Sequence, residues 1–483
     1  MVSRRHSRFA TSLIAFLSAV ACTDGPGTAP LNPATIITVA NEHQFGVIDA
    51  PVTLLPSVVV RDDSGNPVAG IRVNFVPSSG GGTVTDPQPL TDANGVATVG
   101  GWTLGTAVGE NRLTVSLPGY TVVPAIIRAD ALGKGFALDS ITAGTEHTCG
   151  LDGAGAAFCW GSNTRGNVGD GTLARRLAPV RVGGGQTFKA IAAGSHSCAL
   201  TSAGAAWCWG PNQEGQLGDG SNLDASVPRR VTGSFVFANI FAGEAHTCAL
   251  TAEGRAYCWG DNSSGQLGDG TFIDRSTPVP VAGNLSFRNL SPTGGDHTCG
   301  VTTGGVAYCW GDNSRGALGD NTQINRALPV VVAGQLNFAQ LYSDGHTCGL
   351  TTTGAAYCWG DNTNGELGDG TNTIRRSPVS VTGGHVFQRL ETGVGATCGI
   401  VATGVAYCWG VNSRGQLGDG TLANRTAPVV SARGMRFRRI AMSLHTCGVT
   451  LEHGAYCWGD NTSGALGSGS TFSSAGPLPV LGP

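Results

Sequence analysis

The cysteines are the most regular residues in this sequence that could do chemistry. Fourteen of the 15 cysteines form seven pairs in the pattern Cys-x9-Cys-Trp-Gly. A catalytic thiol would need one copy to carry a special residue, and zinc sites commonly use Cys-x-x-Cys pairs, which this sequence lacks. The pairs are Cys149 with Cys159, Cys198 with Cys208, Cys248 with Cys258, Cys299 with Cys309, Cys348 with Cys358, Cys398 with Cys408, and Cys447 with Cys457.

Six histidines repeat with the cysteines, two residues before the first member of a pair. They are His147, His196, His246, His297, His346 and His445, whereas the sixth copy has Ala396. A ring of histidines could bind a metal or respond to pH. Their even distribution, and the copy that lacks one, favour hydrogen-bonded structural histidines instead.

An acid and an arginine six residues apart also recur. Asp170, Asp269, Asp320, Asp369 and Asp419 precede Arg176, Arg275, Arg326, Arg375 and Arg425, respectively. Two interpretations stay open: ion pairs that brace a loop, or a basic ring that binds an anionic partner. The nearby GDNSSGQLGDG segment resembles a calcium loop but lacks a bidentate Glu, so we predict turns, no metal and no cofactor.

These residues belong to repeats whose first cysteines are 49 to 51 residues apart, a period that suits a four-stranded propeller blade. In the third copy a turn at Glu253-Gly254 divides two strand-like runs, which predicts a β-hairpin. Cys248 and Cys258 then lie opposite each other, at the roughly 4.5 to 5.5 Å Cα spacing that a disulfide can bridge. The sequence therefore predicts seven disulfides within blades, with buried free thiols as the alternative.

The repeats resemble those of the regulator of chromosome condensation (RCC1) family, through the histidine strand, the CWG-x-N strand end and the GQLG turn. The resemblance covers residues 135–483 and implies an all-β, seven-bladed propeller. We further expect strands from both ends of this region, near Phe136 and Pro477–Val480, to share a blade and lock the ring.

Residues 1–21 have the organisation of an export signal peptide, with Arg4, Arg5 and Arg8 before an apolar run from Phe9 to Ala21. Ala19-Val20-Ala21-Cys22 resembles a lipobox, which predicts lipidation of Cys22 and a tether over 22–34. Ala19-Val20-Ala21 also fits ordinary cleavage and release. The localisation predicted is thus an outer-membrane or cell-surface lipoprotein, with secretion as the alternative.

Residues 35–130 contain no cysteine and show short β-branched runs between turn signals. The pattern VVVRDDSGNPVAGIRVNF…TDANGVAT resembles bacterial immunoglobulin-like domains of invasin- and intimin-type surface proteins. This resemblance implies a β-sandwich that serves as a spacer, with adhesion as a further role.

The net charge of -3 gives no basis for nonspecific nucleic-acid binding. We predict a monomeric, non-catalytic platform that binds a protein or a surface glycan, with no enzyme activity. A second hypothesis is a secreted inhibitor that covers an extracellular enzyme, as a β-lactamase-inhibiting propeller of this family does; it predicts aromatic and aspartate anchors on one face. A polysaccharide lyase or hydrolase would need a carboxylate pair in an axial mouth, and we expect none there.

Overall fold

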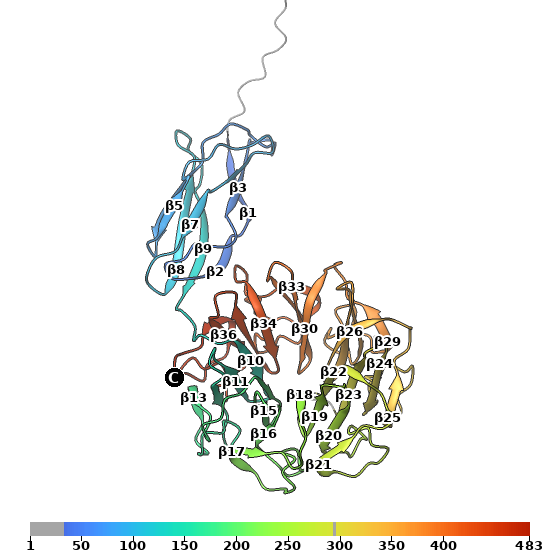
Figure 1. The fold of residues 1–483 in the computed structure, drawn as a ribbon. Coiled ribbons are helices and arrows are strands. Elements are labelled where there is room, and N and C mark those ends of the chain that lie inside the picture. Colours follow the sequence, from blue (N-terminus) through green and yellow to red (C-terminus); the bar gives the residue numbers. More distant parts are fainter. Residues whose placement is uncertain (1–32, 293–295) are drawn as a thin grey trace, which may run out of the picture.

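The computed structural model describes residues 33–292 and 296–483, which are all-β and contain no helix. Accordingly, no helix within these two ranges could cross a membrane. Figure 1 shows an elongated N-terminal unit joined to a ring of blades. The predicted signal peptide, Cys22 and nearly all of the predicted tether lie outside the described residues.

The N-terminal unit has three sheets, ordered β1-β3-β6, β2-β9-β8-β4 and β5-β7. Their strands are β1 (Thr35–Ala40), β2 (His43–Val47), β3 (Ser57–Arg61), β4 (Asn74–Ser79), β5 (Thr83–Thr85), β6 (Val96–Thr98), β7 (Gly101–Thr103), β8 (Gly109–Ser116) and β9 (Ala125–Leu132). Buried residues from all three sheets, such as Val58, Trp102 and Leu113, share one hydrophobic core. The unit therefore has a core of its own, separate from the blades.

Seven four-stranded antiparallel sheets follow, each built from consecutive strands. Blades 1 to 3 are β10 (Ser140–Ala143), β11 (His147–Leu151), β12 (Ala157–Gly161), β13 (Arg176–Arg181); β14 (Ala190–Ala193), β15 (Ser197–Leu200), β16 (Ala206–Gly210), β17 (Ala225–Arg230); β18 (Phe237–Ala242), β19 (His246–Thr251), β20 (Ala256–Gly260), β21 (Arg275–Pro280). Blades 4 and 5 are β22 (Phe287–Pro292), β23 (His297–Thr302), β24 (Ala307–Gly311), β25 (Arg326–Val331); β26 (Phe338–Ser343), β27 (His346–Thr351), β28 (Ala356–Gly360), β29 (Arg375–Ser380). Blades 6 and 7 are β30 (Phe387–Gly393), β31 (Ala396–Val401), β32 (Ala406–Gly410), β33 (Arg425–Val430); β34 (Phe437–Met442), β35 (His445–Thr450), β36 (Ala455–Gly459), β37 (Ser474–Pro479).

The first strand of each blade is the innermost one. These seven strands contact one another in cyclic order, and β10 of blade 1 contacts β34 of blade 7. The ring is therefore closed, and the first strands surround its axis.

A set of hydrogen bonds that we call the interblade clasp joins neighbouring blades. His246 Nε2 lies 2.9 Å from Thr298 Oγ1 of the next blade, and that hydroxyl donates back to the carbonyl of Gln266. The indole N–H of Trp310 donates to the same carbonyl. Since the hydroxyl proton is already committed to the carbonyl, the histidine must donate from Nε2. Each blade thus satisfies its neighbour's polar groups.

Ring closure uses the same clasp. Thr148 of blade 1 lies 2.6 Å from His445 Nε2 of blade 7 and donates to the carbonyl of Ala465. All four strands of blade 7 come from its own repeat, so no strand from the start of this region completes the blade as predicted. The two ends nevertheless meet on blade 7, because Phe136 forms backbone hydrogen bonds with Val480 and Ala455, and Ala137 forms a β-bridge with Gly454.

The N-terminal unit is docked on blades 6 and 7. Phe45 of β2 packs against their core, and its N–H donates to the carbonyl of Arg433 at 2.7 Å. A side chain at Gly434 would meet the Phe45 carbonyl at 2.4 Å, and its φ of +96° also favours glycine. The Tyr456 hydroxyl donates to the carbonyl of Gly133 in the connecting segment.

Candidate functional site: the loop face of the propeller

The seven disulfides lie between the second and third strands of the blades, and they join the cysteines that the hairpin spacing pairs. In every pair the cysteines occupy facing positions with Cα atoms 4.0 to 4.1 Å apart. The bonds are Cys149 to Cys159, Cys198 to Cys208, Cys248 to Cys258, Cys299 to Cys309, Cys348 to Cys358, Cys398 to Cys408, and Cys447 to Cys457. The alternative of buried free thiols is therefore not what the structure contains.

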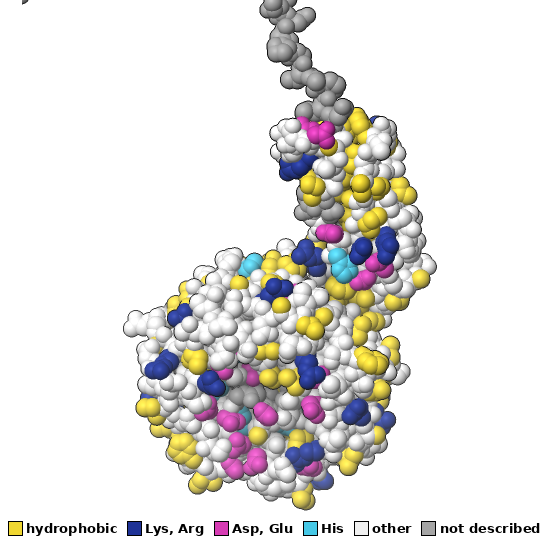
Figure 2. Space-filling view, turned by 180° about the vertical axis from the view of Figure 1, so that it is seen from behind, with side chains coloured by type: hydrophobic (Ala, Val, Ile, Leu, Met, Phe, Trp, Pro, Cys, Tyr) yellow, Lys and Arg dark blue, Asp and Glu magenta, His cyan; other side chains and the backbone are white. Residues whose placement is uncertain are grey.

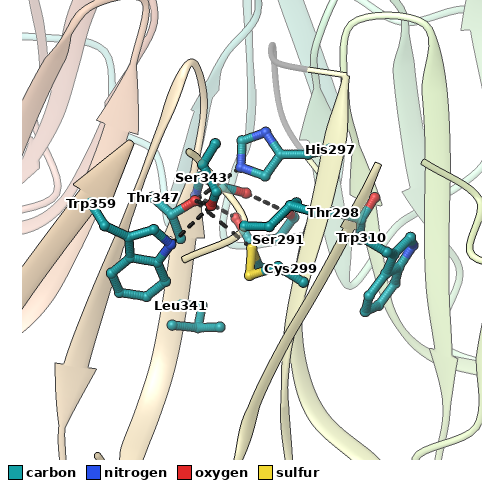
Figure 3. Close-up of a disulfide and its surroundings, with 12 residues drawn as sticks. Ser291, His297, Thr298, Cys299, Trp310, Leu341, Ser343, Thr347 and Trp359 are labelled. Atoms are coloured by element: carbon teal, nitrogen blue, oxygen red, sulfur yellow. Dashed lines mark hydrogen bonds between the residues drawn. A yellow bond between two sulfur atoms is a disulfide. The ribbon is translucent and has the colours of Figure 1, made fainter. Parts of the chain in front are cut away.

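All fourteen of these cysteines are buried. Figure 3 shows Cys299 beside the clasp, with His297 directed toward Thr347. Because a disulfide must be accessible to a thiolate before it can be exchanged, none of the seven is exposed for exchange chemistry. The disulfides brace the framework of the blades.

The six repeated histidines are buried structural groups. Burial lowers the pKa of His147 and His196 to about 3 and that of His246, His297, His346 and His445 to about 4, so all are neutral at physiological pH. In residues 33–292 and 296–483, no group of three or more His, Cys, Asp or Glu side chains is placed to hold a metal ion. The histidines serve the clasp.

The long loop between the third and fourth strands is organised by a buried asparagine. In blade 3 the Asn262 Oδ1 accepts the N–H of Leu267. Its Nδ2 group donates to Asp269 and to the carbonyls of Thr271 and Ile273. Asn163, Asn212, Asn313, Asn362, Asn412 and Asn461 occupy the same position and are equally buried. The polar side chain of Asn262 in the GDNSSGQLGDG segment is thus hydrogen-bonded within its own loop.

The repeated arginines pair with the repeated aspartates. Arg275 reaches the Asp269 carboxylate at 3.0 Å, and only 9% of the Asp269 side chain is exposed. Burial raises the pKa of Asp269, but hydrogen bonds from Thr271 and Arg275 outweigh it, so the pKa lies below its usual value. The equivalent pairs are Arg176–Asp170, Arg326–Asp320, Arg375–Asp369 and Arg425–Asp419. Their charges are neutralised in place, which favours loop bracing over a basic ring.

The same loops present large apolar side chains to solvent. In six of the seven blades, one or two such residues lie just after the Thr or Ser that follows the GDG or equivalent turn. We call them the apolar rim: Leu173, Leu223, Phe272, Ile273, Ile324, Leu422 and Phe472, with exposures from 56% to 81%. The asparagine fixes the backbone at Ile273, so that the rim is held in place before any partner binds. Exposed apolar groups at recurring positions on one face are typical of a protein-binding surface.

Acidic side chains gather at the axis on this face. The loops between first and second strands carry Glu244, Asp296 and Asp344, and the adjacent loops carry Asp261 and Asp312. The two sets are tied together, since the N–H groups of Asp261 and Asp312 donate to the carbonyls of Ala245 and Asp296. Figure 2 shows Asp and Glu side chains around the centre of the propeller. We call these five residues the acidic mouth.

A cavity of about 280 Å³ opens at the acidic mouth, lined by Glu244, Asp344 and small or apolar residues from the first strands and the loops that follow them. Burial raises the pKa of Asp344 to about 6, and the negative charge of Glu244 adds to this effect. The pKa values of Glu244 and Asp296 are also raised by burial and by neighbouring carboxylates. The expectation that no carboxylates meet in an axial mouth is therefore wrong.

The acidic mouth is the feature that the sequence interpretation missed. Its residues stand at positions that vary between repeats, so comparison of the repeats hides them. A usable signal exists nonetheless, because Glu146, Glu244, Asp296 and Asp344 all lie one or two residues before a clasp histidine. Loops at equivalent places in successive blades converge at the axis, which brings single acids together.

Comparison with known proteins agrees with the blade architecture. The model described as RCC1-like domain matches residues 79–400, and the model described as regulator of chromosome condensation (RCC1) repeat matches residues 403–448. The first match begins within the N-terminal unit, although the first blade begins only at Ser140. No curated protein sequence matches the chain.

Solved structures with a similar fold include human WBSCR16, at 19% identity and a TM-score of 0.59, covering 77% of this chain and 96% of that one. Prp20p from Saccharomyces cerevisiae has 21% identity and a TM-score of 0.61, covering 69% and 87% of the two chains. Yeast RCC1 (Prp20) bound by Kap60 gives 20% identity and the same TM-score, covering 72% and 85%. The match to the RCC1-like domain alone spans more than half of the 483 residues of the present chain. This protein therefore belongs to the RCC1-like domain family.

Proposed function

We propose that this protein is an exported, lipid-anchored binding platform whose propeller recognises its partner through the loop face. The observation that carries the proposal is the set of seven buried disulfides. Such bonds persist in oxidising compartments and are rare in the reducing cytosol. RCC1-like propellers are typically non-catalytic binding or exchange-factor domains, and binding is the role that the loop face suits.

In this proposal residues 1–21 are cleaved off, and lipid on the new N-terminal Cys22 holds the protein at the cell surface. The N-terminal unit, with an immunoglobulin-like identity, then serves as a stalk. Its docking on blades 6 and 7 supports this role, because a stalk that packs against the propeller holds the binding face at a set distance and direction.

A second candidate function, a secreted inhibitor of an extracellular enzyme, is favoured by the side chains on the loop face. Such an inhibitor needs aromatic and aspartate anchors on one face. The exposed rings of Phe272 and Phe472 and the carboxylates of Asp261 and Asp312 provide both types. The two functions share the binding face and differ in whether the N-terminus is lipidated.

Intact mass of the protein from its native envelope tests the proposal. Alkylation before and after reduction counts free thiols, and we expect fourteen protected cysteines together with a diacylglycerol-modified Cys22. An unmodified, processed N-terminus in the medium would favour the secreted inhibitor. Fourteen freely alkylated thiols in the native protein would contradict export to an oxidising compartment.

A further inference from the structure

The acidic mouth lacks a compensating cation. In the described part of the chain, no Lys or Arg side chain comes within ion-pair distance of Glu244, Asp296 or Asp344. Two arginines of the surrounding loops are engaged elsewhere, Arg165 with Asp224 and Arg414 with Asp460. The mouth therefore concentrates negative charge in a protein whose net charge is only -3.

Asp344 is the most buried of these acids. Only 9% of this residue is exposed, and it lines the axial cavity. Among the described residues, the only hydrogen bond to its carboxylate comes from the neighbouring N–H of Gly345. A buried carboxylate normally has a cation or several donors around it. Asp344 and Glu244 thus offer free acceptor oxygens to whatever enters the cavity.

The apolar rim supplies an independent observation about the size of the partner. It lies on the same loop face as the acidic mouth, since both are formed by loops that follow the first and third strands. A small ion or a polyamine bound at the axis would leave the apolar side chains of Leu223, Phe272 and Phe472 exposed to solvent. A protein that contacts this face buries them while it reaches the axis.

We propose that the loop face binds a basic polypeptide, which inserts a lysine or arginine side chain into the axial cavity between Glu244 and Asp344 while its apolar surface covers the rim. This inference rests on the proposed function and specifies the partner. A long aliphatic stem with a cationic head fits the cavity, whose lining beyond the two acids is small or apolar and includes Ala242, Val394 and Met442. The described residues of that lining include no aromatic ring on which a sugar could stack.

A charge-neutral double variant of the full chain, Glu244→Gln with Asp344→Asn, tests the proposal. Both substitutions keep side-chain size, and the new amide oxygen at position 344 can still accept the Gly345 N–H. The matched control is Glu253→Gln with Glu452→Gln, which removes two acids from turns at the opposite end of the blades. Both variants shift net charge equally, so a difference between them reports position.

The probe is a ten-residue lysine peptide, titrated calorimetrically at low and at physiological salt. We expect the mouth variant to bind at least about tenfold more weakly than the wild type and the control variant to bind within about twofold of it. Equal weakening of the two variants would overturn the proposal, because binding would then follow overall charge. Spermine or Ca²⁺ binding to the mouth as tightly as the peptide would also overturn it, in favour of a small cation.

A second arm separates this inference from the proposed function. Cell-surface crosslinking is compared between the mouth variant and a rim variant, Leu223→Ser with Phe472→Ser. A crosslinked partner that is lost in both variants supports the basic polypeptide. If the partner is lost only in the rim variant, the proposed binding platform is supported and the axial insertion is refuted. If the partner is lost in neither variant, both the binding platform and the axial insertion are refuted.

Discussion

The clasp histidines should make the propeller strongly acid-sensitive. A histidine whose pKa is lowered in the folded state stays neutral there, while the unfolded chain binds a proton below its ordinary pKa of 6.5. The stability of the folded state is therefore complete above about pH 6.5 and falls as the pH drops toward the folded value of about 4. For His346 alone, the loss across that window is about 3 kcal/mol.

Several groups contribute at pH 5. The six histidines take up about five to six protons on unfolding, given folded pKa values of about 3 or 4. Two carboxylates act oppositely, because Asp344 and Glu391 have folded pKa values of about 6 and about 7 and are already protonated. The net uptake of about four protons predicts that the free energy of unfolding falls by roughly 5 kcal/mol per pH unit.

A pair of variants isolates one histidine. His346→Ala, which copies the natural Ala396 of blade 6, should reduce the slope near pH 5 by about 1.4 kcal/mol per pH unit. Thr397→Ala removes the 2.6 Å hydrogen bond between His346 Nε2 and the Thr397 hydroxyl, but it leaves the imidazole ring of His346 buried. This variant should therefore lower the free energy of unfolding by about 1 kcal/mol at every pH, and the dependence of that free energy on pH should stay as in the wild type.

Guanidinium unfolding with intact disulfides, followed by tryptophan fluorescence at pH 7, 6 and 5, measures these slopes. Eight of the nine tryptophans lie in the propeller, so the signal reports mainly on the blades. An unchanged slope in His346→Ala would refute the assignment of proton uptake to this histidine. A slope reduced equally in Thr397→Ala would show that the hydrogen bond, and not burial, holds the pKa down.

Three further outcomes are expected from other parts of the framework. Replacing Cys248 and Cys258 together by Ser should lower stability by about 2 to 3 kcal/mol in denaturant unfolding, because the bridge closes a short loop; no change would mean that strain offsets the entropy. Asp344→Asn should raise the melting temperature at pH 8 but not at pH 4, since the raised pKa of Asp344 makes its ionisation destabilising only above about pH 4; a lower melting temperature at pH 8 would contradict this. Arg275→Ala should lower the free energy of unfolding by about 1 to 2 kcal/mol, because it leaves the Asp269 carboxylate unpaired. The control is the same substitution at the exposed Arg255. An equal loss of stability in the two variants would show that the ion pair does not brace the loop.

The blade framework is largely predictable because its chemistry repeats. The hairpin arithmetic that places Cys248 opposite Cys258 depends only on the turn at Gly254, which has the positive φ of 80° that such a turn requires. The recurrence of an acid and an arginine six residues apart, as in Asp269 and Arg275, likewise offers the ion pair as one of its two interpretations, and the structure contains that pair. Local spacing is sufficient in both cases because the partners lie within one blade.

Contacts between blades are harder to predict. The Thr298 hydroxyl is hydrogen-bonded to His246, about 50 residues earlier, and to the carbonyl of Gln266, about 30 residues earlier. The sequence of the repeat that contains Thr298 does not indicate these contacts. The acidic mouth is harder still, since Glu244 and Asp344 are 100 residues apart and meet only because the ring closes. Sequence comparison among repeats finds what all blades share, whereas a binding site depends on what single blades do differently.

The clasp also decides how the ring comes apart. In an open array of repeats the terminal units have one neighbour each, so they fray first and need special capping repeats. Here the joint between blades 7 and 1 carries the Thr148–His445 hydrogen bond and the Trp160 contact to Ala465, like five of the six internal joints. The joint between blades 6 and 7 has Ala396 in place of the histidine but keeps the hydrogen bonds from Thr446 and Trp458 to the Gln416 carbonyl. Seven blades therefore share seven joints, and releasing any one blade requires two of them to break at once. The chain has two ends, but the cooperative structure has none.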